Sequence, residues 1–176
     1  MTYFEKIKAT TQFLKEKISF EPEVGIILGT GLGGLVNDIE ILHEFAYSGI
    51  PNFPESTVES HDGKLLFGNL EGKKVVCMQG RFHYYEGYDM KEVTFPIRVM
   101  KLLGVQILMI SNAAGSTNAD IEKGDLVIID DHINLHIESP LRGPNLDEFG
   151  PRFPDLIEPY SKRLNALALD LSLIHI

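Results

Sequence analysis

The sequence predicts an α/β fold with a mixed, largely parallel central sheet flanked by helices. Two observations carry this prediction. Short apolar runs, of the length expected for buried strands, alternate along the chain with segments of helical periodicity. No internal repeat, low-complexity tract or linker breaks this alternation, so we expect the 176 residues to form a single domain, 1–176.

The first half of the chain predicts one helix and three strands. Residues 2–18 carry Ile7, Thr11 and Leu14 among apolar positions spaced three and four apart, which is typical of an amphipathic helix. The run EVGIILG, residues 23–29, is short, apolar and stopped by glycine, as expected for a buried strand. The run LLFGNLEGKKVVCMQG, residues 65–80, predicts two strands joined by a turn in its middle, from Asn69 to Gly72.

The alternation continues in the second half. The run MKEVTFPIRVMKLLG predicts a helix over residues 90–104, with Pro96 early in it, where a helix tolerates proline best. Two further buried strands are predicted, VQILMI at 105–110 and DLVIID at 125–130. Residues 142–155 are rich in proline and glycine and predict a loop.

The carboxyl end of the sequence is unusual for a domain. A helical pattern begins at Tyr160 and runs into LSLIHI without a cap, a polar tail or a closing strand. We therefore expect a domain that is incomplete at its C-terminus, and residues 171–176 are candidates for foreign residues. Such a chain would lack elements that cover its core, and we expect it to be inactive by itself.

Composition limits the class of protein. Apolar residues make up 44% and charged residues 23% of the chain, which is ordinary globular composition. The net charge of −9 repels nucleic acid and anionic membranes, so neither is an expected partner. Cys77 is the single cysteine and is expected to be a buried apolar side chain. Because signal-peptide and membrane-length apolar runs are also absent from the sequence, we expect a cytoplasmic protein.

Glycines follow the first predicted strand in GTGLGG, residues 29–34. The amides of such a loop can cradle a phosphate, and Thr30 adds a hydroxyl donor. A tight turn without a ligand explains this motif equally well. A dinucleotide site would need an acidic residue closing a second strand about 20 residues on. Glu55 instead follows a proline in the loop IPNFPES, which disfavours a nicotinamide-dependent oxidoreductase.

Arg81 and His83 follow the glycine that ends another predicted strand. Residues i and i+2 of an extended backbone share a face, so both side chains should point the same way. The arginine fork suits a bidentate grip on phosphate, histidine adds a donor, and Tyr85 offers flat apolar surface for a sugar or base. The alternative is a surface arginine beside a hydrogen-bonded histidine. Glu86 is a candidate to orient either residue.

Small residues follow a third predicted strand in ISNAAGS, residues 110–116. The amide of Ala113 or Ala114 could donate to an anion, and Asn112 could orient a neighbour, although a compact turn explains this loop better in isolation. All three loops follow the carboxyl end of a predicted strand, where open α/β sheets bind ligands. His61 could join them from a preceding loop, so together they predict an anion pocket.

Seven ordered segments resemble the purine nucleoside phosphorylases of the trimeric class across residues 20–155. They are EVGIILGTGLGGL, IPNFPESTVESHDGKLLFG, MQGRFHYYEGY, VTFPIRVMKLLGV, NAAG, GDLVIIDDHINL and LRGPN. The resemblance implies the nucleoside phosphorylase fold and a reaction of purine salvage. In that reaction a purine (deoxy)ribonucleoside and phosphate give the free base and (deoxy)ribose 1-phosphate. It also implies inorganic phosphate as co-substrate, no metal or organic cofactor, and a homotrimer.

The resemblance implies roles for individual residues, each carried over by its motif. The purine-binding motifs of the family have no match in this sequence, so base preference is not implied. The implied phosphate ligands are Thr30, His61, Arg81, Phe82, His83 and Ala113, with Arg81 and His83 also catalytic. The implied nucleoside-binding residues are Tyr85, Asn112 and Phe149, the last reaching into the site of a neighbouring subunit.

Overall fold

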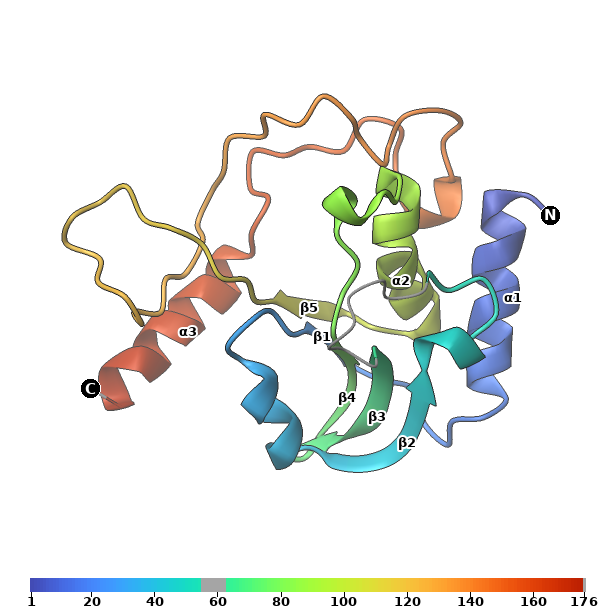
Figure 1. Cartoon of the computed structure of the whole chain (residues 1–176), viewed down its shortest axis with the longest axis horizontal. Helices are drawn as coiled ribbons and strands as arrows, with labels where there is room; N and C mark the ends of the chain where they lie inside the picture. Colours follow the sequence, from blue (N-terminus) through green and yellow to red (C-terminus); the bar gives the residue numbers. More distant parts are fainter. Residues whose placement is uncertain (55–62, 176) are drawn as a thin grey trace. The chain divides into compact units, whose positions relative to one another are not determined.

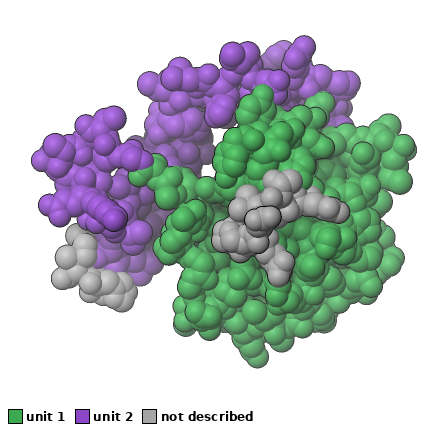
Figure 2. All heavy atoms as spheres, in the orientation of Figure 1, with its two compact units in different colours: residues 1–114 green, residues 115–176 purple. Residues whose placement is uncertain are grey.

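The structure is a computed structural model that describes residues 1–54 and 63–175. The chain divides into two compact units, residues 1–114 and 115–176 (Figure 2). Among the described residues, the first unit holds two α-helices and a β-sheet, and the second holds one α-helix and long irregular segments. That the whole of 1–176 acts as one domain stays a prediction.

A five-stranded mixed sheet forms the first unit (Figure 1). In chain order the strands are β1 (Val24–Ile27), β2 (Glu40–Ala46), β3 (Lys64–Leu70), β4 (Lys73–Gln79) and β5 (Ile107–Ile110). Their spatial order is β2-β3-β4-β1-β5, with β1 parallel to β4 and β5 and the β2–β3 and β3–β4 pairs antiparallel. The predicted mixed α/β fold is confirmed, although only two of the four ladders among the described residues are parallel.

The predicted hairpin between β3 and β4 is confirmed. Leu70 pairs with Lys73, so the turn consists of Glu71 and Gly72. Both turn residues have positive φ, 49° and 75°. Two-residue hairpin turns with positive φ at both positions match the twist of the flanking strands, which explains the tight connection.

Helices α1 (Tyr3–Lys15) and α2 (Met90–Leu103) pack side by side (Figure 1). The ring of Tyr3 meets that of Phe95 edge-on, with 5.9 Å between centroids. The Tyr3 hydroxyl also donates to the carbonyl of Lys91 at 2.7 Å. On α1, Ile7, Thr11 and Leu14 are buried, as the apolar spacing predicted.

The start of α2 is set by a capping box between Asp89 and Glu92, and Gly104 ends the helix in the left-handed conformation, φ 111°. Since the helix begins at Met90, Pro96 is its seventh residue. The expectation that this proline lies early in the helix is therefore wrong. Proline there leaves one main-chain carbonyl of the preceding turn without its helical N–H partner.

Apolar side chains fill both faces of the sheet. On the α2 face, a Cβ added at Gly25 would lie 3.1 Å from Sδ of Met100 and from Cδ1 of Leu108. On the opposite face, Leu35 and Val36 of the 3₁₀ helix η1 (Gly33–Asp38) pack on a buried cluster. That cluster consists of Ile26, Leu28, Ile39, Leu66, Val75 and Cys77, which confirms the predicted burial of the cysteine.

The second unit realises the predicted elements only in part. Helix α3 (Lys162–His175) confirms the helical pattern that was expected from Tyr160, and the loop at 142–155 contains one short 3₁₀ turn, η4 (Asp147–Phe149). The strand predicted at 125–130 is wrong, because no described residue pairs with it in a ladder. An apolar run forms a strand only where a neighbour takes up its backbone hydrogen bonds.

Contacts inside the second unit join α3 to the irregular chain that precedes it. His132 Nδ1 lies 3.1 Å from the Tyr160 hydroxyl, and the Asn165 amide donates to the carbonyl of Ile129 at 3.2 Å. In neither unit is any described helix long and apolar enough to cross a membrane.

Candidate anion-binding site

Three loops leave the sheet together at the carboxyl ends of β4, β1 and β5. These strands are neighbours and run parallel, so the chain exits all three at the same edge. Backbone bonds continue just past the strands: Leu28 N donates to Met78 O at 3.2 Å, and Ser111 N donates to Ile27 O at 3.0 Å. The three glycine-rich or small-residue loops predicted from the sequence are therefore adjacent.

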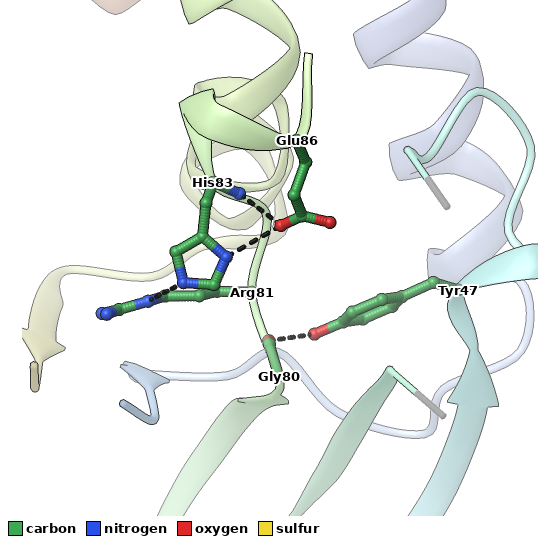
Figure 3. Close-up of polar contacts among 5 residues, drawn as sticks. All are labelled: Tyr47, Gly80, Arg81, His83 and Glu86. Atoms are coloured by element: carbon green, nitrogen blue, oxygen red, sulfur yellow. Dashed lines mark hydrogen bonds and ion pairs between the residues drawn. The ribbon is translucent and has the colours of Figure 1, made fainter. Parts of the chain in front are cut away.

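The exit from β4 is held by Tyr47, which precedes this strand in the chain. Its hydroxyl donates to the carbonyl of Gly80 at 2.7 Å (Figure 3). Gly80 has φ 90°, a conformation that a residue with a side chain adopts only with strain. Burial raises the pKa of the Tyr47 phenol, so its hydroxyl stays protonated and remains a donor. This bond fixes the backbone directly before Arg81.

Alternation of side chains then separates the site from the core. Phe82 is buried, with its ring 5.0 Å from Tyr47 and 6.2 Å from Phe53 between centroids. Arg81 and His83 lie together on the other side, where Arg81 Nε donates to His83 Nε2 at 3.2 Å (Figure 3). The prediction that these two side chains share a face is confirmed.

Glu86 contacts the His83 imidazole on the side opposite Arg81. One carboxylate oxygen, Oε1, accepts from the backbone N–H of His83 and lies 2.8 Å from its Nδ1 (Figure 3). Since His83 Nε2 accepts from Arg81, the neutral ring carries its proton on Nδ1 and donates it to Glu86. The side chain of Glu86 is only 2% exposed, so this carboxylate faces the imidazole rather than solvent. Glu86 therefore orients His83.

The guanidinium of Arg81 is fixed at a second point. Its Nη1 donates to the carbonyl of Ser111 at 2.8 Å, in the loop that follows β5. Arginine has five N–H donors in one plane. Two of them are engaged by Ser111 and His83, which sets the plane of the group, and the same group can hold a further acceptor with its remaining donors.

The loop after β1 closes against the same serine. Gly29 N donates to Ser111 Oγ at 2.8 Å. A Cβ added at Gly29 would lie 2.4 Å from the Ser111 carbonyl oxygen, so only glycine allows this approach. Thr30 follows directly and is exposed, as are Asn112 and Ala113 after Ser111. Their polar groups therefore lie in joined loops and are accessible.

The chemistry of this edge favours an oxyanion. Arg81 supplies permanent positive charge, while Thr30 and the loop amides supply neutral donors. Glu86 is nearly buried behind His83. No group of three or more histidine, cysteine or acidic side chains suited to a metal occurs in residues 1–54 and 63–175. One fixed positive charge with neutral donors in the adjacent loops, on a chain with net charge −9, is the arrangement expected of a local anion site.

Sequence comparison places this chain in a known family. The sequence model of the phosphorylase superfamily matches residues 23–175. The chain belongs to the phosphorylase superfamily. Purine nucleoside phosphorylase 1 of Geobacillus stearothermophilus is 57% identical over 166 residues, which are 94% of this chain and 61% of the relative. Purine nucleoside phosphorylase of Bos taurus is 49% identical over 168 residues, 94% of this chain and 58% of the relative.

Solved structures agree with this phosphorylase assignment. Isoform 2 of purine nucleoside phosphorylase from Schistosoma mansoni, in complex with cytosine and ribose-1-phosphate, has a TM-score of 0.91 and 46% identity. The match covers 98% of this chain and 61% of that one. The resemblance seen in the sequence is thus confirmed. The chain spans about 60% of the length of the curated relatives described above.

Within this phosphorylase chain, the predicted site residues fall into three groups. Arg81 and His83 contact each other, and Tyr85 stacks on the His83 ring with 4.8 Å between centroids and 21° between planes. Thr30, Asn112 and Ala113 lie in loops that Ser111 joins. The side chain of Phe82 is in the core, so only its backbone could meet an anion.

Two predicted site residues, His61 and Phe149, do not belong to these three groups. His61 lies outside the described residues. Phe149 belongs to η4 of the second unit, and its contact with a neighbouring subunit stays a prediction.

Two residues that hold the site were not predicted. Ser111 had a usable signal, because it is a hydroxyl residue placed directly after a strand, inside a loop already suspected of binding an anion. Tyr47 had none, since it lies 33 residues from Gly80 and no local pattern connects them.

Proposed function

We propose that this site binds inorganic phosphate, the co-substrate for phosphorolysis of purine nucleosides to a free base and a pentose 1-phosphate. The observation that supports this proposal most strongly is the position of the Arg81 guanidinium. His83 and the Ser111 carbonyl hold it at the edge where three parallel strands end. Relatives named purine nucleoside phosphorylase support the reaction class. Solved neighbours in complex with ribose-1-phosphate and with hypoxanthine support the two product classes, a pentose 1-phosphate and a free base.

In this proposal the chain positions phosphate beneath the sugar. Arg81 holds it with charge-assisted bonds, and the Thr30 hydroxyl and the Ala113 amide add donors, together with His61. His83 joins this set through Nε2 when that nitrogen carries a proton in place of the bond it accepts from Arg81. Fixed orientation converts a bimolecular encounter into an oriented one. The negative charge of phosphate also stabilises the positive charge that develops on the sugar as the glycosidic bond breaks.

The remaining roles belong to the same proposal. Tyr85 and Asn112 contact the nucleoside, and Phe149 covers the sugar of a neighbouring subunit in a homotrimer. Phosphate serves as co-substrate without a resident metal or organic cofactor. The enzyme works in the cytoplasm, a setting supported by its single, buried cysteine.

Calorimetric titration of phosphate into the 176-residue chain tests the proposal. We expect measurable binding, and Arg81→Ala should weaken it by about 2–3 kcal/mol, the typical worth of hydrogen bonds to a charged group. Arg152→Ala is the matched control, because its guanidinium also donates to a backbone carbonyl, that of Leu141, at 2.8 Å. Phosphate affinity that is unchanged in Arg81→Ala would refute the assignment. Inosine phosphorolysis by the same preparation tests separately whether this chain is inactive by itself.

A further inference from the structure

We propose that the side chain of Ser111 is a positioning residue, which sets the Arg81 guanidinium for phosphate. This inference rests on the proposed function and deepens it. Ser111 follows β5, the strand next to β1, and its polar atoms reach the loops of two other strands.

All three polar atoms of Ser111 are engaged. Its N–H donates to Ile27 O at 3.0 Å and its hydroxyl donates to the same carbonyl at 3.3 Å. The hydroxyl oxygen accepts from Gly29 N at 2.8 Å. Its carbonyl accepts from Arg81 Nη1 at 2.8 Å. One residue therefore connects the loops after β1, β4 and β5.

The hydroxyl controls where the carbonyl lies. Gly29 and Ser111 approach so closely that an added Cβ at Gly29 would be 2.4 Å from the Ser111 carbonyl oxygen. The bond from Gly29 N to Ser111 Oγ holds that contact in one arrangement. Without the hydroxyl, the Gly29 amide loses its partner and the backbone at residue 111 is free to shift. The Arg81 guanidinium would then lose one of its two fixed points.

The same bonds argue against direct contact between this hydroxyl and the anion. A serine hydroxyl has one proton to donate, and here it goes to Ile27 O. Ser111 thus acts through Arg81. Its substitution should change phosphate affinity without removing any donor that the anion itself uses.

Phosphate titration of two variants tests the role. Ser111→Ala should bind phosphate about three- to tenfold more weakly, as loss of one hydrogen bond predicts, whereas Ser111→Thr, which keeps the hydroxyl, should bind as the unmodified chain does. Ser19→Ala is the matched control, since it loses a hydroxyl that contacts His43 of the edge strand β2. Unchanged affinity in Ser111→Ala, or equal weakening in Ser111→Thr, would overturn the proposal.

A double variant tests whether the effect passes through Arg81. In the Arg81→Ala background, Ser111→Ala should cause no further loss of affinity, measured by phosphorus NMR at high phosphate. If the losses of phosphate affinity in the two single variants add up in the double variant, the serine does not act through Arg81.

Hydrogen exchange of the unmodified chain keeps the idea testable if Ser111→Ala does not fold. The Gly29 amide should exchange slowly, because it donates to Ser111 Oγ, and exchange at the rate of an unfolded chain would overturn the tie. This measurement does not depend on phosphate. Failure of the unmodified chain to bind phosphate would reject the proposed function, whereas an unprotected Gly29 amide would reject the role of Ser111.

Discussion

The two compact units use their apolar residues in opposite ways. In residues 1–114, Leu66, Phe67 and Val76 lie in central strands and are fully buried. In residues 115–176, Leu126 is 86% exposed and Ile133 88% exposed, although Leu126 lies in DLVIID, an apolar run of strand length. An apolar run therefore becomes a strand only when neighbouring strands satisfy its backbone and cover its side chains.

Among substitutions that contrast the two units, truncation of a core side chain should change the free energy of unfolding most. Phe67 is fully buried, with its ring edge-on to those of Phe20 and Phe45. Phe67→Ala should lower the free energy of unfolding by about 3–5 kcal/mol, because it leaves a cavity in β3.

The matched change in the second unit is Phe153→Ala, at a side chain that is 86% exposed. Its cost should stay within about 0.5 kcal/mol, as for most surface substitutions. Urea denaturation of both variants measures the difference. Equal losses in the free energy of unfolding would contradict the proposed difference in packing between the units.

A smaller effect is expected from removing one tyrosine hydroxyl in each unit. Tyr47→Phe loses the bond to the Gly80 carbonyl and leaves a half-buried acceptor unpaired, so we expect a loss of about 1–2 kcal/mol in the free energy of unfolding. Tyr160→Phe loses only an exposed contact with His132 and should cost about 0.5 kcal/mol or less. Thermal unfolding of both variants checks this. Because Gly80 precedes Arg81, Tyr47→Phe should also weaken phosphate binding, whereas Tyr160→Phe should not.

The smallest effect concerns the pH dependence of the first unit. Burial raises the pKa of the Cys77 thiol to about 12. The folded state therefore keeps this proton at a pH where the unfolded chain, with its ordinary thiol pKa, has released it. The resulting stability is fully present below about pH 8.5 and is lost as the pH rises toward 12, by about 1 kcal/mol at pH 9.

Cys77→Ala isolates this contribution, because it removes the thiol and with it that part of the slope between pH 8.5 and 10. Denaturant titrations at a series of pH values measure the slope in both proteins. Identical slopes would show that the thiol is not shielded. In the native chain we also expect thiol reagents to label Cys77 only as fast as the first unit opens.

Local pattern was sufficient for several parts of the site. Period-two alternation correctly predicts that Arg81 and His83 share one face. The hairpin turn at Glu71 and Gly72 lies within the predicted range, Asn69 to Gly72. The same reasoning failed at 125–130, where the apolar spacing is that of a strand but no described strand lies alongside.

Local sequence pattern is sufficient to predict the helix and strand periodicities, the hairpin, the shared face of Arg81 and His83, and the family to which the chain belongs. Those properties repeat every few residues or occur as contiguous motifs, so neighbouring side chains encode them. The contacts of Tyr47 with Gly80, and of Ser111 with Gly29 and Arg81, join residues 33, 82 and 30 positions apart and follow from the folded arrangement alone. Such contacts depend on how β4, β1 and β5 are ordered in the sheet, and that order results from packing of the whole unit rather than from any one segment.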